Sequence, residues 1–193
     1  MKKKIKEIKK TAAALKIFVA LMIWITIFTC ISVYPETYEF WNQSISSLGH
    51  KISTNGLPNE AHMLFTIGLT IVGITLIIIA IIAIKKKDRA GIILIPSGIG
   101  AFLVGWISTN DNKLLHQFGA ICFLYLMMLY VLVKFWKTEN PALRGIAFGL
   151  VALGMIYLIS DLQEADFKHI LQKVFVFIDT LIFMSTALLK EQN

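Results

Sequence analysis

The stretch "AHMLFTIGLTIVGITLIIIAIIAI", residues Ala61–Ile84, decides the fold class of this chain. It runs from end to end without an acidic residue, a lysine or an arginine. At a rise of about 1.5 Å per residue, an α-helix of this length crosses a hydrocarbon core about 30 Å thick. Because a lipid-exposed backbone must satisfy its own hydrogen bonds, we expect this segment to be a helix that spans a membrane.

Five further stretches of the same character lie around it in a chain of 193 residues, of which 56% are hydrophobic. The six expected spans are Leu15–Val33, Ala61–Ile84, Gly91–Ser108, His116–Phe135, Ala142–Ser160 and Lys173–Leu189. The alternation of apolar and polar residues that marks a transmembrane β-barrel is missing from them. The sequence therefore predicts an all-α fold: a polytopic integral membrane bundle of six transmembrane helices, forming one domain over residues 1–193.

The basic residues predict how this bundle is oriented. With the N-terminus inside, 15 of the 19 lysines and arginines fall on the inner face, and Lys51, Lys113, Lys168 and Lys173 fall outside. The positive-inside rule then places both termini in the cytoplasm, with a short basic tail over residues 1–14, in a multi-pass protein of the cell membrane. The net charge of +7 is explained by this orientation, so no nucleic-acid partner is expected.

The basic start "MKKKIKEIKK" also permits a second interpretation, in which the first apolar stretch is a secretory signal peptide. The stretch is longer than the apolar region of a typical signal peptide, and no A-x-A cleavage site follows it. A retained membrane anchor is the favoured interpretation.

The longest outer loop, residues 34–60, contains the segment "SISSLG" at positions 44–49. Its serines alternate with Ile45 and Leu48, which predicts a short interfacial helix with its apolar side against the bundle and its serines toward a cavity. Asn42 is a candidate N-cap for this helix, and Gly49 is a candidate C′ residue, which directly follows the end of the helix.

All four histidines map to the predicted outer face. We expect an outer polar pocket there, and the candidate ligand-binding residues are Ser46, His62, Asp111, His116 and Asp179. Histidine with carboxylate suits general acid–base catalysis, and it also suits zinc, for which His62, His116 and His169 are the candidate ligands. His50 and Asp111 could complete such a zinc site, in which His62 and His116 are expected to be the closest pair. Ordinary interfacial polarity remains an alternative, since no HExxH, GxSxG or paired CxxC motif is present.

Asp179 lies near the middle of the last expected span. A carboxylate at that depth is costly unless it is paired, hydrated or protonated, so an intramembrane acid is by default a functional hypothesis. We expect it to point into the bundle, toward Thr26, Thr70 or Tyr125, which lie at similar depth. A purely structural hydrogen bond to one of these hydroxyls is the alternative.

Small residues predict close contacts between helices. Ser97, Ala101 and Gly105 are spaced four apart, and Gly145 and Gly149 form a GxxxG step. We favour packing within the chain over dimerisation for both, and a homo-oligomer remains open.

The segments "YPETYEFWNQSISSLG", "LPNEAHMLFTIGLTIVGI" and "AFLVGWISTNDNKLLHQFGAICFL" together resemble the prokaryotic membrane family called domain of unknown function 998. The elements that carry the resemblance are Ile45–Gly49, Asn59 with Phe65, and Asp111 with His116. The family's proline before the histidine is missing here. The loop motif is also similar, more distantly, to the DRAM, Frag and Sfk type of six-helix proteins, which implies membrane lipids as partners.

Three functions follow from these patterns. The favoured one is a protein that binds or organises lipid headgroups without catalysis. The second is an intramembrane hydrolase or transferase, with Asp111 and His116 as general base and Ser46 as nucleophile. The third is a proton-coupled transporter in which Asp179 carries the proton.

Overall fold

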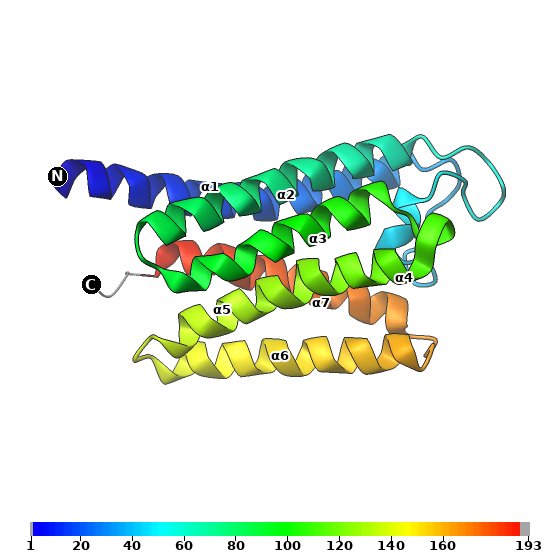
Figure 1. Cartoon of the computed structure of the whole chain (residues 1–193). Helices are drawn as coiled ribbons and strands as arrows, with labels where there is room; N and C mark the ends of the chain where they lie inside the picture. The colour runs from blue at the N-terminus through cyan, green and yellow to red at the C-terminus, as the bar shows by residue number, and fades with distance from the viewer. Residues whose placement is uncertain (1, 190–193) are drawn as a thin grey trace.

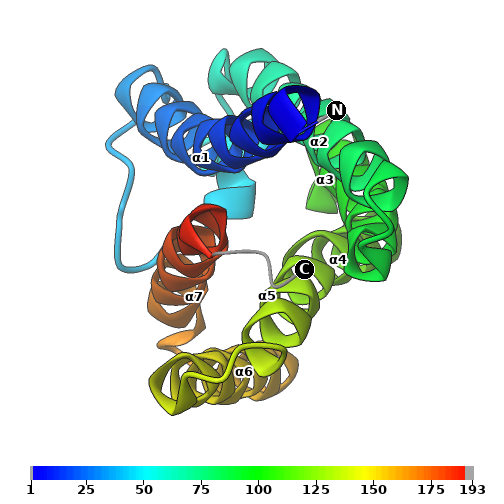
Figure 2. The same cartoon turned by 90° about the vertical axis from the view of Figure 1, so that its left-hand side faces the viewer.

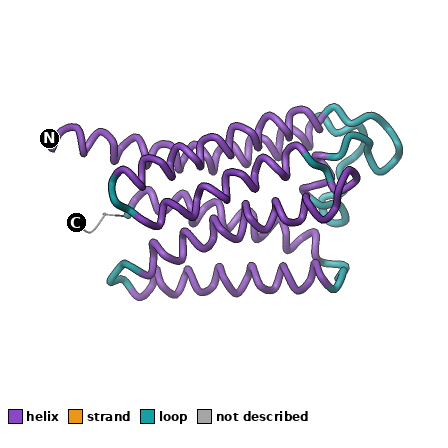
Figure 3. The backbone as a smooth tube through the Cα atoms, in the orientation of Figure 1, coloured by secondary structure: helices purple, strands orange, loops and turns teal. Residues whose placement is uncertain are grey.

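The computed structural model describes residues 2–189; Lys190, one of the basic residues assigned to the inner face, lies outside them. Every regular element within the described residues is helical (Figure 3). In chain order the longer helices are α1 (Lys2–Ser32), α2 (Ala61–Lys85), α3 (Leu94–Trp106), α4 (Thr109–Ala120), α5 (Leu126–Trp136), α6 (Pro141–Leu162) and α7 (Lys168–Ser185). Short helical turns join or extend them, namely η1 (Ile45–Gly49), η2 (Arg89–Ile93), the π-helical turn η3 (Ile121–Tyr125) and η4 (Thr186–Leu188).

Six continuous spans in this chain are long and apolar enough to cross a membrane, as the sequence predicts. They are Lys10–Ser32, Ala61–Lys85, Arg89–Trp106, Thr109–Trp136, Pro141–Leu162 and Lys168–Leu188. The fourth span joins α4, η3 and α5 into one rod (Figure 1). The all-α architecture with six membrane-length helices is therefore confirmed.

The spans pack in chain order around a ring, which Figure 2 shows from the end that carries both termini. α2 lies between α1 and α3, α3 packs on the α4–η3 segment, and α1 contacts α7 to close the ring. α6 packs on α5 and α7 only at the edge of the bundle, where little of it is buried. We call the end that carries residues 33–60 the loop end, and the end that carries the termini and the turns after α2 and α5 the basic end.

α2 shows why these helices suit a lipid environment. Its inward face buries Phe65, Val72 and Leu76, whereas Ile74 and Ile81 on its outward face remain exposed. A helix that is apolar on its exposed face as well as its buried face has no polar side to offer to water.

Two predicted loops at the loop end are shorter than expected. Ser108 and Asp111 form a capping box that starts α4 at Thr109, so most of the predicted loop 109–115 is helical, with a kink at Asn112. The last span begins at Lys168 and not at Lys173, which shortens the predicted loop 161–172.

The two small-residue patterns have opposite outcomes. Ser97 and Ala101 are fully buried, and a Cβ atom on Gly105 would lie 3.1 Å from Leu69 Cβ on α2, so this packing stripe is confirmed. Gly145 and Gly149 have nothing within 4 Å of where a Cβ atom would lie. The prediction that this GxxxG step packs within the chain is wrong, because α6 turns that face outward.

Candidate functional site

The segment "SISSLG" forms the short helix η1, folded against the bundle at the loop end. Ile45 and Leu48 are buried, as predicted from the alternation. The N-cap, however, is Ser44, whose hydroxyl accepts a hydrogen bond from the Ser47 amide at 3.2 Å. The prediction of Asn42 as the N-cap is wrong, because the helix begins at Ile45. Gly49 is the last residue of the helix and not the residue that follows it.

Three of the residues that carry the resemblance, Gly49, Asn59 and Phe65, form one packing unit at η1. The Asn59 amide group donates hydrogen bonds to the carbonyls of Leu48 and His50, at 3.1 and 2.7 Å. Gly49 lies so close to the ring of Phe65 that a Cβ atom there would come within 2.7 Å of it. These residues therefore hold the loop on α2, and this explains the motif without a ligand.

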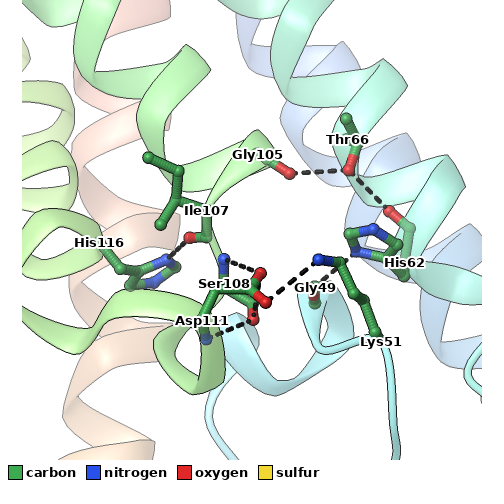
Figure 4. A network of polar contacts seen from close by, with 9 residues as sticks. All are labelled: Gly49, Lys51, His62, Thr66, Gly105, Ile107, Ser108, Asp111 and His116. Carbon is green, nitrogen blue, oxygen red and sulfur yellow. Dashed lines mark hydrogen bonds and ion pairs between the residues drawn. The ribbon is translucent and has the colours of Figure 1, made fainter.

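His62 and His116 also hold backbone at the loop end (Figure 4). A hydrogen bond of 2.8 Å joins His62 Nδ1 to the Gly49 carbonyl, and one of 2.5 Å joins His116 Nδ1 to the Ile107 carbonyl. The two imidazoles thus hold two separate backbone segments at the loop end. His62 holds η1, and His116 holds the turn between α3 and α4.

Asp111 is engaged away from both imidazoles (Figure 4). Its carboxylate accepts from the Ser108 amide and hydroxyl at 3.3 and 3.0 Å, and it pairs with Lys51 at 3.1 Å. The Ser46 hydroxyl lies 2.9 Å from that of Ser44. The catalytic arrangement of Ser46, Asp111 and His116 is therefore not assembled by these contacts, because the acid caps a helix.

The zinc hypothesis lacks a ligand set within residues 2–189, where no three histidine, cysteine or acidic side chains converge. His50 is the histidine whose pKa is affected by His116. Burial lowers the pKa of His50, and the nearby His116 lowers it further. Asp111 acts in the opposite direction. His50 Nε2 is held by the Thr109 hydroxyl at 2.5 Å. His169, the third candidate, lies in the first turn of α7.

Gln172 and Lys173 at the start of α7 clamp the loop, a role that the sequence reasoning missed. Gln172 Oε1 accepts from the Ile45 amide at 2.8 Å. Lys173 Nζ is buried; it donates to the Gln43 carbonyl and lies 4.9 Å from the centre of the Phe40 ring. The loop and α7 are thus tied together by one amide and one ammonium group.

A cavity of about 60 Å³ lies beneath η1, between the helices. Its polar lining comes from Thr26, Ser46, His116 and Gln172, and the rest is apolar. Pockets for small organic ligands usually measure about 300–1,000 Å³, so this cavity is too small for a lipid headgroup. Two of the candidate residues of the predicted outer pocket, Ser46 and His116, line this cavity together.

The larger cavity lies at the basic end and measures about 1120 Å³. Lysines from three separate parts of the chain line it: Lys16 of α1, Lys86 and Lys87 after α2, and Lys134 and Lys137 around the end of α5. Two acids, Asp88 and Glu139, are also in the lining. The sequence signal for this site is the excess of basic residues on the predicted inner face.

Two features fix the shape of this cavity. Lys134 and Asp88 form an ion pair of 3.0 Å that is largely buried and joins the α2–η2 turn to α5. Lys87 adopts a left-handed backbone conformation, with φ of 62°, where a glycine is usual. This conformation closes a Schellman motif at the end of α2, in which the Asp88 amide donates to the Ala83 carbonyl at 2.9 Å and the Lys87 amide to the Ile84 carbonyl at 2.8 Å.

Asp179 is fully buried, as predicted, but it does not meet the predicted hydroxyls. Neither carboxyl oxygen has a hydrogen-bond partner. Thr70 instead accepts from Trp106 Nε1 at 3.0 Å, and the Tyr125 hydroxyl donates to the Gly154 carbonyl at 2.9 Å. The expected hydrogen bond is therefore absent, and the Asp179 carboxyl group is buried in the core without a hydrogen-bond partner.

Comparisons of the chain with protein-family models, with curated proteins and with solved structures find no match. The resemblance seen in the loop motif stays a prediction, and the functional argument rests on the geometry of the chain itself.

Proposed function

We propose that the chain is a multi-pass membrane protein that binds an anionic lipid headgroup at its basic end, without catalysis. The observation that carries this proposal is the convergence of five lysines and, among the described residues, two acids around one open cavity. The cavity lies at the ends of membrane-length helices, which is the level of the lipid headgroups. Its size fits a phosphate-containing headgroup, and its charge favours an anion.

The orientation suggested by the basic residues supports the same proposal. The positive-inside rule assigns the basic end to the cytoplasmic face. The cytoplasmic leaflet is rich in anionic lipids, and a basic residue near such a surface contributes about 1 kcal/mol of attraction. The lysines therefore face the leaflet that holds their ligand.

The lining divides into fixed and adaptable lysines. Lys134 is neutralised by Asp88, and Lys16 donates to the Thr186 carbonyl at 3.4 Å while lying 5.3 Å from the centre of the Tyr130 ring. Lys87 and Lys137 are exposed at the mouth. We assign headgroup binding chiefly to Lys87 and Lys137, because these long, exposed side chains can bring their ammonium groups to a phosphate.

The loop end supports a binding protein over an enzyme. Ser46, Asp111 and His116 are each engaged in holding loop backbone or neighbouring hydroxyls. The geometry required of a nucleophile, a base and an orienting acid in mutual reach is not formed by these contacts.

Thermal unfolding of the purified protein with added lipids tests the proposal. A ligand that binds only the folded state raises Tm with its concentration. We expect phosphatidylglycerol, which is anionic, to raise Tm, and phosphatidylcholine, which is zwitterionic, to leave it unchanged.

Matched charge variants locate the effect. The double variant Lys87→Gln with Lys137→Gln should lose the response to phosphatidylglycerol. The control, Lys113→Gln with Lys168→Gln, removes the same amount of charge at the loop end and should keep the response to phosphatidylglycerol. Equal responses of the two double variants, or equal stabilisation by both lipids, would refute a headgroup site in the basic cavity.

A further inference from the structure

Asp179 is a fully buried acid without a partner, and nothing in the proposed lipid site uses it. Its two oxygens lack any hydrogen bond in the structure. A charged carboxylate in such a place is costly, and a neutral acid there still leaves a polar group unsatisfied. The position therefore indicates a group whose partner arrives from outside the chain.

The position of Asp179 along α7 shows where such a partner can come from. Gln172, Val176, Asp179, Phe183 and Thr186 follow one another at intervals of three or four residues, so they share the inward face of α7 and of the turn η4 that continues it. Val176 and Gln172 line the loop-end cavity, and Thr186 lines the basic cavity. Asp179 lies about 4.5 Å along the helix axis from Val176 and about 10 Å from Thr186.

The loop-end cavity has the properties of a water site. Its volume of about 60 Å³ exceeds the share of about 30 Å³ that one water molecule occupies in the liquid. Thr26, Ser46, His116 and Gln172 supply donors and acceptors around it. Since His116 Nδ1 is held by the Ile107 carbonyl, Nε2 is the nitrogen that can exchange a proton with this cavity.

The route from the basic end is less favourable. Lys16 is in the lining of that cavity, and its ammonium group repels an approaching proton. Phe183, fully buried, lies between Asp179 and Thr186 on the inward face. A proton is therefore expected to reach Asp179 from the loop end.

The elements packed against α7 are α1, α5, α6, η1 and η4. Among the described residues, the buried or half-buried titratable groups of these elements, together with those of η3 and of α7 itself, are Lys16, Cys30, Cys122, Tyr125, Tyr130, Lys134, Tyr157, Asp161, Lys168, His169 and Lys173. Tyr125 and Lys173 donate to backbone carbonyls, and the Tyr157 hydroxyl accepts from Gln172. The unpartnered oxygens of Asp179 set it apart from these groups.

We propose that Asp179 is a proton-binding site that exchanges its proton through the loop-end cavity. The carboxylate accepts one proton, passed along water in the cavity and through His116, and becomes a neutral acid; release is the reverse. No other bond forms or breaks. The site is separate from the lipid site, so either proposal can fail without the other.

Infrared difference spectroscopy of the protein in liposomes, between high and low pH, tests this proposal. A protonated buried carboxyl gives its own C=O stretching band, which shifts in D₂O. We expect a band that grows as pH falls, is lost in Asp179→Asn and is kept in the control Asp166→Asn, which alters an exposed acid. If Asp179→Asn does not fold, Asp179→Glu keeps a carboxyl and should move the band.

The route is tested by filling the cavity. Ala120→Leu places a larger side chain in its lining and should slow the D₂O shift of the band in protein that is folded by circular dichroism. A band that never changes with pH, or one that Asp179→Asn leaves in place, would overturn the proton site. An unchanged exchange rate in Ala120→Leu would overturn the route.

Discussion

At the scale of single residues, Asp179 shows which structural properties the sequence predicts and which it does not. Its place in an apolar span predicted burial, and burial was found. The lack of a partner could not be predicted, because Thr70 and Tyr125 are taken by Trp106 and by the Gly154 carbonyl. Depth in the membrane can be counted along a helix, whereas the direction of a hydroxyl depends on packing between helices.

The lack of a partner predicts that Asp179 destabilises the fold. An unsatisfied buried polar group costs about 1–3 kcal/mol, so Asp179→Leu should raise the free energy of unfolding by a similar amount. Thr180, its equally buried neighbour, accepts from Trp24 Nε1 at 2.9 Å, so Thr180→Val should lower it. Denaturant unfolding in detergent measures both. A lower stability for Asp179→Leu would mean that the acid has a structural partner.

His50 predicts a pH dependence at the loop end. Burial lowers its pKa below the ordinary value near 6.5, so the unfolded state binds more protons between that value and the lower folded one. This contribution to stability is therefore present above about pH 6.5 and is lost as pH falls through the folded pKa.

Limited proteolysis of residues 51–58 across this pH range measures the effect. We expect faster cleavage at acidic pH in the wild type and a weaker pH dependence in His50→Gln, which keeps a polar group toward Thr109. The same pH dependence in both proteins would remove His50 as the cause.

At the scale of elements, hydropathy located all six spans but missed how the fourth one begins and bends. Its start was readable, because Ser108 and Asp111 have the spacing of a capping box. The π-helical turn at Ile121–Tyr125 has no such signature. The turn lies where Gly100 of α3 meets Phe123, and Ser97 donates to the Phe123 carbonyl at 2.8 Å, so it depends on a neighbouring helix.

This contact predicts opposite outcomes for two glycines. A Cβ atom on Gly100 would lie 2.5 Å from the Phe123 amide nitrogen, so Gly100→Ala should force the helices apart and lower Tm. Gly145 has open space, so Gly145→Ala should leave Tm unchanged or raise it, since alanine favours a helix by up to about 1 kcal/mol over glycine. Thermal unfolding of the two variants compares them directly. A loss of stability in Gly145→Ala would reveal a packing partner for α6.

At the scale of the whole molecule, the polar side chains at the two ends of the bundle have different roles. The loop end is rich in histidine and serine, which drew the sequence interpretation toward catalysis or zinc, yet these side chains mostly hold loop backbone. The basic end holds the larger cavity, and its lysines come from positions more than 100 residues apart. The charge excess was visible in the sequence, but its convergence on one cavity requires that α1 and α5 meet across the ring.

The most direct test of the account is where an anionic lipid touches the chain. Phosphatidylglycerol carrying a photoreactive diazirine near its headgroup would be incorporated into nanodiscs with the protein, irradiated, and mapped by peptide mass spectrometry. The account predicts crosslinks in residues 12–16, 86–88 and 134–140, which line the basic cavity, and their loss in the double variant Lys87→Gln with Lys137→Gln. Crosslinks concentrated in residues 44–50 and 108–116, or spread evenly over both ends, would contradict it.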